Sequence, residues 1–114
     1  NNPVTRKPQP PAAFGWAAPA TGPDGDRRDA LADWLTDPKN KFFAPSVANR
    51  VWFHLIGRGI VDPVDDFRDT NPPSNPELLN ALAESFAKGG YRLKPLVRLI
   101  LNSNTYQLAS EAPE

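Results

Sequence analysis

The clearest periodic pattern in the chain lies in residues 76–88, where apolar and polar side chains recur with helical spacing. One face holds five apolar residues: Leu78, Leu79, Leu82, Ala83 and Phe86. Residues three and four apart share a face of an α-helix, and the opposite face of this segment is polar. Asn75 or Ser74 is available to cap the start, and Gly89 and Gly90 end the pattern. The pattern predicts an amphipathic helix.

Two further helices are predicted before this one. The first begins at Asp26, whose carboxylate can cap it, and ends near Pro38, because the residue before a proline is pushed out of the helical region. The second has Pro45 in its first turn and runs to about Ile56, where Gly57 can take the left-handed conformation that closes a helix. Its apolar side chains cover more than one side, so we expect this helix at the centre of the fold.

A fourth helix is predicted from about Pro95, with Arg98 as the only charged residue in an apolar run, and a short fifth turn can follow it. Strand-like runs occur only at residues 60–61 and 91–93, which are too short to build a sheet. The predicted fold is therefore all-α, a compact bundle of four to five short helices preceded by an extended, proline-rich arm.

In the first 25 residues, the apolar positions follow neither the spacing of a helix nor the alternation of a strand. They contain six of the 14 prolines and three of the seven glycines, a composition typical of linkers. We therefore predict an arm or linker at 1–25, a helical domain at 26–110 and a C-terminal tail at 111–114. Trp16 is a large aromatic residue in this arm, which makes it a candidate anchor for a neighbouring domain or a sugar.

Charge and composition exclude several classes of function. Thirteen basic and thirteen acidic residues cancel, so neither a nucleic-acid partner nor binding to anionic membranes is expected. No apolar run is long enough for membrane insertion. The absence of cysteine excludes disulfides, cysteine-ligated metals and covalent haem attachment, and we expect no cofactor in this chain. The start at Asn1 in place of a methionine indicates a piece of a longer protein.

The segment 49–67 joins the central helix to an acidic turn and holds the only histidine. Arg50 and His54 are four residues apart on one helix and so project near each other, and Arg58 follows just after the helix end. Arginines bind anions and histidine can carry a proton, which together predict an anion or carboxylate pocket. The alternative is that His54 packs at the edge of the core and Arg50 pairs with the acidic turn, because no nucleophile or second ligand accompanies the histidine.

The acidic turn holds four aspartates: Asp62, Asp65, Asp66 and Asp69. Carboxylate oxygens bind calcium, but this spacing differs from that of an EF-hand loop. Two adjacent carboxylates also lack the separation and the cleft that glycoside hydrolysis needs. The simpler interpretation is that the aspartates cap the turn and pair with Arg50, Arg58 or Arg68.

Several short motifs carry a family resemblance: Asn49-Arg50-Val51-Trp52, His54, Gly57-Arg58-Gly59-Ile60-Val61, Asp65-Asp66-Phe67, Asn71-Pro72-Pro73-Ser74 and Ser103-Asn104-Thr105-Tyr106. With them, the chain from about Arg27 to Ser110 resembles the planctomycete secreted domain of type one, a family of unknown function. The resemblance implies a domain near the C-terminus of a large periplasmic or secreted protein, with haem c bound elsewhere in that parent. It also implies carbohydrate-binding modules nearby, and it brings no catalytic residues with it.

Two functions are therefore expected. The first is a non-catalytic helical module that packs against neighbouring domains of its parent chain. The alternative is a carbohydrate-binding, anion-binding or accessory enzyme domain that acts on a polysaccharide. Its site would use five charged residues: Arg50, His54, Arg58, Asp65 and Asp66.

Overall fold

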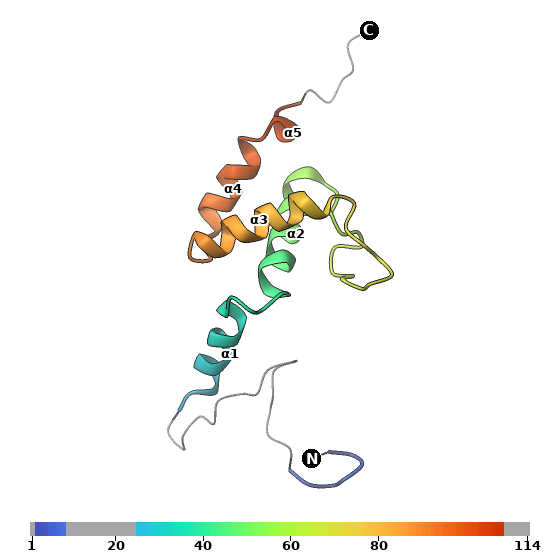
Figure 1. Ribbon diagram of the computed structural model, residues 1–114, viewed down its shortest axis with the longest axis vertical. Coiled ribbons are helices and arrows are strands. Elements are labelled where there is room, and N and C mark those ends of the chain that lie inside the picture. Colours follow the sequence, from blue (N-terminus) through green and yellow to red (C-terminus); the bar gives the residue numbers. More distant parts are fainter. Residues whose placement is uncertain (1, 9–24, 109–114) are drawn as a thin grey trace. The chain divides into compact units, whose positions relative to one another are not determined.

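The computed structural model describes residues 2–8 and 25–108, in which five helices and no strand occur. The helices are α1 (Arg27–Thr36), α2 (Phe43–Ile56), α3 (Pro76–Lys88), α4 (Leu93–Leu101) and α5 (Asn104–Gln107) (Figure 1). The prediction of an all-α chain with four to five short helices is confirmed. The chain divides into two compact units, Asn1–Asp37 and Pro38–Glu114, which are considered separately.

The first unit contains α1. The carboxylate of Asp26 caps this helix by accepting a hydrogen bond from the backbone N–H of Arg28 at 2.9 Å, as predicted, and the helix ends before Pro38. Trp34 is only half-buried, and α1 has no buried residue. Of the predicted arm at 1–25, the structure describes residues 2–8 and 25, and Trp16 lies outside the described residues.

The second unit contains the hydrophobic core. Helix α2 packs against both α3 and α4, so its predicted central position is confirmed, and Trp52 is buried there. Eleven buried apolar residues form the core: Ala44, Ala48, Trp52, Ile60, Val61, Leu79, Leu82, Ala83, Phe86, Leu96 and Ile100. Among residues 2–8 and 25–108, no helix is long and apolar enough to span a bilayer.

Helix α2 has Pro45 in its first turn, as predicted, whereas α4 begins slightly earlier than the sequence pattern predicts. Helix α2 starts at Phe43, two residues before Pro45, because the side chain of Asn40 accepts hydrogen bonds from the backbone N–H groups of Phe42 (2.9 Å) and Phe43 (3.0 Å). Helix α4 likewise starts two residues before Pro95. The N–H groups in the first turn of a helix have no acceptor within the helix. A proline, which lacks this group, is therefore tolerated at the third residue as well as at the first.

Other predicted helix ends are confirmed. Asn75 accepts a hydrogen bond from the N–H of Leu78 at 3.0 Å and caps α3. Gly57 closes α2 with a φ of 88°, and its N–H donates to the carbonyl of Phe53 at 2.8 Å. These ends fix where the loop between α2 and α3 leaves one helix and enters the next.

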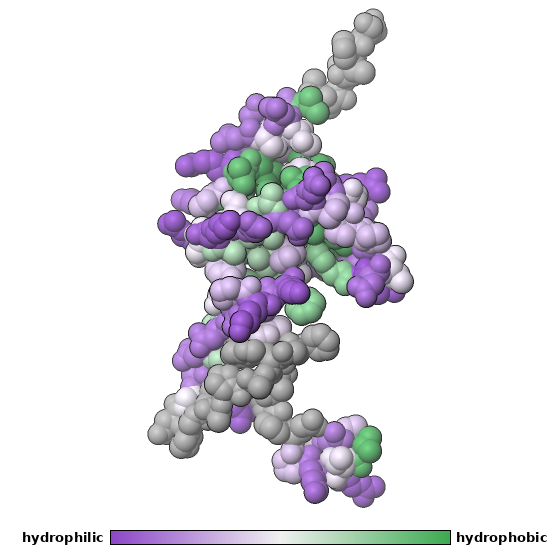
Figure 2. Space-filling model, in the orientation of Figure 1, coloured by the Kyte–Doolittle hydropathy of each residue, from purple (hydrophilic) through white to green (hydrophobic). Residues whose placement is uncertain are grey.

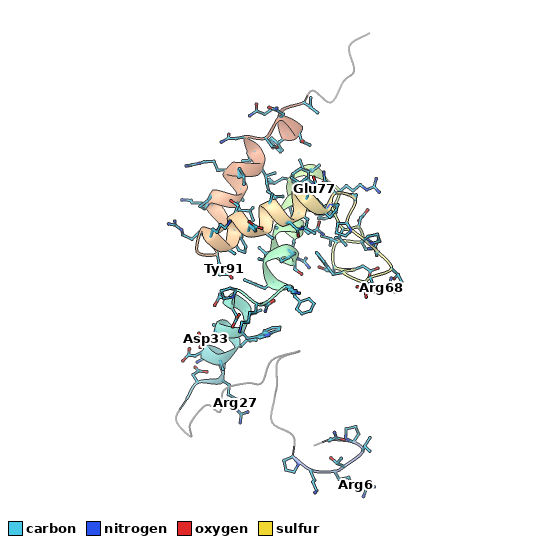
Figure 3. The ribbon with its side chains drawn as sticks, viewed as in Figure 1. Arg6, Arg27, Asp33, Arg68, Glu77 and Tyr91 are labelled. Carbon is cyan, nitrogen blue, oxygen red and sulfur yellow. The ribbon has the colours of Figure 1, made fainter. Side chains whose placement is uncertain are left out.

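The turn between α3 and α4, where Figure 3 labels Tyr91, is stabilised by aromatic packing. Tyr91 has a φ of 57°, a conformation that costs a residue with a side chain about 1–2 kcal/mol. Its ring lies 5.4 Å from that of Phe86 and 5.8 Å from that of Phe43, and such pairs each contribute roughly 0.5–1.5 kcal/mol. The two ring contacts therefore offset the backbone strain and bring the start of α2 to the end of α3.

Candidate functional site

The polar centre of the second unit is Asn49, a residue of α2 whose side chain is completely buried. Its Oδ1 accepts hydrogen bonds from the backbone N–H groups of Ile60 at 2.7 Å and Val61 at 3.0 Å. Its Nδ2 donates to the carbonyl oxygens of Val61 at 2.9 Å and Val64 at 3.0 Å. One amide thus uses both donor hydrogens and both acceptor positions, and it attaches residues 60–64 to α2.

Two more polar side chains hold the loop that leads to α3. The hydroxyl and the N–H of Ser74 both donate to the carbonyl oxygen of Ile60, at 2.9 Å and 2.8 Å. The side chain of Asn71 donates to the carbonyl oxygens of Asp66 at 2.9 Å and Asp62 at 3.3 Å. Together with Asn49, these side chains fix the loop at both of its ends.

Gly59 is required by space. A Cβ at this position would overlap the carbonyl oxygen of Val61 and lie 3.3 Å from Nδ2 of Asn49. Gly57, two residues earlier, has open space around it, and its glycine is favoured by the positive φ alone. The two glycines of the Gly57-Arg58-Gly59 motif thus serve different purposes, and only Gly59 contacts the buried amide.

The arginines and aspartates of the candidate site form three ion pairs: Arg50 with Asp65, Arg58 with Asp62, and Arg68 with Asp66. This is the pairing that the simpler interpretation of the acidic turn predicts. The Arg58 pair is loose, at 3.5 Å, and 81% of the Arg58 side chain is exposed. Because solvent screens such pairs, each contributes little to stability.

The pair of Asp66 and Arg68 differs from the other two. The guanidinium donates two hydrogen bonds to the carboxylate, at 2.5 Å and 2.6 Å, and the Asp66 side chain is only 23% exposed. The hydrogen bonds from Arg68 lower the pKa of Asp66 below its ordinary value. Figure 3 marks Arg68 on the loop between α2 and α3. This carboxylate therefore stays ionised at neutral pH and is a weak candidate for a general acid.

His54 lies on α2 with its side chain exposed, and its ring meets that of Phe53 edge-on at 5.5 Å. Among the described residues it makes no hydrogen bond or ion pair with Arg50 or Arg58. In the same part of the chain, no group of three or more histidine, aspartate or glutamate residues is placed to hold a metal ion. The structure thus joins Arg50 to Asp65 but leaves His54 outside the ion pairs. Trp16 lies outside the described residues.

A small hollow lies beside the loop. It has a volume of about 130 Å³ and is lined by Arg58, Gly59, Ile60, Asp62, Asn71, Pro72 and Ser74. Pockets that bury a small molecule usually measure roughly 300–1,000 Å³. The hollow can therefore hold only one group of a larger ligand, which polar atoms of the loop would contact.

Comparison with known families identifies a family for this chain. Residues 27–114 match the family model PSD1, described as a protein of unknown function (DUF1553). The chain belongs to the PSD1 family. No curated protein and no solved structure matches it. The family resemblance inferred from the motifs is confirmed, and it assigns no chemistry to the PSD1 residues described above.

The sequence pattern does not predict the roles of the residues that hold the PSD1 loop. Asn49 and Asn71 stood out only as members of family motifs, and Ser74 was a candidate helix cap, whereas in the structure Asn75 caps α3 and Ser74 binds the carbonyl of Ile60. For Asn49 a signal exists, because an asparagine three residues before Trp52 and one after Ala48 lies on the apolar face of a helix, where an amide needs partners. Asn71 and Ser74 lie in a proline-rich segment that has no such period.

We expect Asn49→Leu to lower the free energy of unfolding by roughly 3 kcal/mol or more. The substitution keeps the branched shape of the side chain but leaves two N–H groups and two carbonyl groups without their partner, and each unsatisfied buried group costs about 1–3 kcal/mol. Urea denaturation measures the change, and amide hydrogen exchange at Ile60 and Val61 should accelerate. The control is Asn80→Leu, at an exposed position of α3. Equal losses in the two variants would contradict the role of Asn49.

The ion pair of Asp66 predicts a pH effect. Because the pKa of Asp66 is lower in the folded protein than in the unfolded chain, the pair favours folding at neutral pH, and its contribution is lost as the pH falls through the lowered pKa. Arg68→Gln should raise the pKa of Asp66 towards its ordinary value and remove this acid dependence. Carbon-13 NMR of the Asp66 carboxyl group measures its pKa as the pH is varied, and Arg58→Gln serves as the control. An unchanged Asp66 pKa in Arg68→Gln would disprove the assignment.

Proposed function

We propose that this PSD1 domain is a non-catalytic helical module of a multidomain exported protein, and that it packs against a neighbouring domain of its parent chain. Following the family resemblance, the parent is periplasmic or secreted and carries haem c in another region. The proposal gives the domain a binding surface and no reaction.

One observation carries this proposal: the charged groups that chemistry would need are paired with one another. Arg50 binds Asp65, Arg58 lies against Asp62, and Arg68 binds Asp66. A catalytic set needs a nucleophile or a base held against its partner in a cleft that excludes water. His54 stands exposed and outside these pairs, so the described site lacks that arrangement.

The same residues suit an interface. Arg50, Phe53 and His54 share one side of α2, since they are three and four residues apart, and Asp65 joins them through its ion pair with Arg50. We call these four residues the docking face. Interfaces are enriched in arginine and aromatic residues, and charge pairs at their rim set partner and orientation. The docking face has this composition.

The test is a titration of the isotope-labelled chain with the haem-bearing region of its parent protein, followed by amide NMR. We expect chemical shifts to change at Arg50, Phe53, His54 and Asp65. Replacing both Arg50 and His54 with alanine should weaken the complex at least about 5-fold, the cost of losing one important contact. Asn80→Ala on α3 should leave the affinity unchanged. If no amide signal shifted when the haem-bearing region was added, the proposal would be contradicted.

A second function is favoured by the hollow beside the loop. Arg58, Asp62 and Asn71 present a guanidinium, a carboxylate and an amide to a space of about 130 Å³, and these groups hydrogen-bond readily to sugar hydroxyl or sulfate groups. The alternative proposal is therefore that the domain holds one unit of a polysaccharide there. An arginine that is largely exposed and loosely paired is available for such a ligand.

Titration with neutral and sulfated oligosaccharides distinguishes this alternative. If it holds, a sulfated oligosaccharide should shift the amide signals of Gly59, Asn71 and Ser74, and Arg58→Gln should weaken binding several-fold, since a hydrogen bond to a charged group contributes roughly 1.5–3 kcal/mol. Arg68→Gln is the matched control, because Arg68 pairs with Asp66 and does not line the hollow. Binding that is insensitive to Arg58 would rule out the hollow as the sugar site.

A further inference from the structure

A second surface feature lies between α3 and α4, and no residue of the loop lines it. Helices α3 and α4 border an open groove of about 470 Å³, lined by Ser85, Lys94, Pro95, Arg98, Leu99 and Asn102. Figure 1 places α4 beyond the C-terminal end of α3, whereas the loop precedes its N-terminal end. Figure 2 shows hydrophobic residues over this part of the unit with hydrophilic residues around them. The groove is therefore separate from the docking face.

The floor of the groove is apolar although it faces water. On α4, Leu96 and Ile100 are each 1% exposed and belong to the core, whereas Leu99 is 46% exposed. Pro95 lies one turn before Leu99 on the same side of the helix. An exposed leucine in a concave site offers an apolar contact that the fold itself does not use.

The rim of the groove is basic. Lys94 and Arg98 are four residues apart on α4, and within residues 2–8 and 25–108 neither forms an ion pair. No carboxylate lines the groove. The contrast with the loop is clear, since Arg50, Arg58 and Arg68 all have aspartate partners there. Two positive charges beside an apolar floor are complementary to a segment that carries carboxylates next to an apolar side chain.

We infer that the groove binds an acidic segment of a partner protein. An apolar side chain of that segment lies over Leu99 and Pro95, and its carboxylates pair with Lys94 and Arg98. A peptide fits better than an anionic membrane, because polybasic membrane-binding segments carry clusters of about 4–8 basic residues, the groove has two, and the net charge of the chain is zero. The inference is independent of the proposed docking face, and either can fail without the other.

The first experiment uses the 114-residue chain and a fluorescently labelled peptide of alternating glutamate and leucine. We expect saturable binding by fluorescence anisotropy, and amide shifts in the labelled protein at Ser85, Arg98, Leu99 and Asn102. A peptide with lysine in place of glutamate should not bind. Shifts that map to α2 or to the loop, or equal binding of the two peptides, would overturn the inference.

Variants of α4 then test the charges. Replacing both Lys94 and Arg98 with glutamine should weaken binding of the glutamate peptide roughly 2- to 30-fold, since exposed ion pairs contribute about 0.2–1 kcal/mol each. Arg92→Gln is the matched control, because the Nε of Arg92 donates to the carbonyl of Gly89 at 3.2 Å and Arg92 does not line the groove. An equal loss in Arg92→Gln would show that only general charge attraction is at work and would overturn the inference.

A charge swap provides a gain of function that misfolding cannot mimic. With Lys94→Glu and Arg98→Glu combined, the chain should no longer bind the glutamate peptide and should bind the lysine peptide instead. A last experiment tests whether the native chain binds vesicles that contain phosphatidylserine. If the native chain bound these vesicles through Lys94 and Arg98 but ignored the glutamate peptide, the surface would be a membrane contact and the inference would be wrong.

Discussion

The second unit depends on one buried side chain, the amide of Asn49. Ile60 and Val61 are 4% and 1% exposed, so their N–H groups are removed from water, and the described chain has no strand that could pair with them. An unpaired buried N–H is costly. Asn49 supplies both acceptors from within α2, and the apolar side chains of Ile60 and Val61 can join the core only because it does so. The position of Ile60 also determines the path of the loop, because its carbonyl oxygen accepts the hydrogen bonds of Ser74, which lies just before the start of α3.

The size of each interaction decides which residues are structural. The three ion pairs lie at the surface, where solvent screening leaves each of them a small contribution to stability, whereas three of the four hydrogen bonds of Asn49 are buried and the fourth is partly buried. The loop would therefore keep its path without Arg50 or Arg58. The charged residues that dominate the sequence motif are dispensable for the fold, which is consistent with a role in contacts outside it.

The helices could be predicted from the sequence because their signals are local. The apolar spacing of residues 76–88, the cap at Asn75 and the glycine at Gly57 each depend on neighbours within a few positions. The role of Asn49 could not be predicted in this way. Its hydrogen-bond partners lie 11 to 15 residues further along the sequence, and the spacing of apolar residues gives no information about contacts at that separation. The ion pairs were predicted only as a set, since composition gives the charges but the path of the loop decides that Arg50 meets Asp65.

A loop that is fixed before binding has a consequence for recognition. Ordering a flexible segment at an interface costs roughly 0.5–1.5 kcal/mol for each immobilised side chain, in addition to the backbone entropy. The hydrogen bonds of Asn49, Asn71 and Ser74 offset the backbone part of that cost when the domain folds, because they fix the backbone path of residues 60–66. A small helical domain can thus offer a rigid polar surface without a sheet or a disulfide, because one buried amide takes the place of the strand that the segment 60–64 would otherwise need.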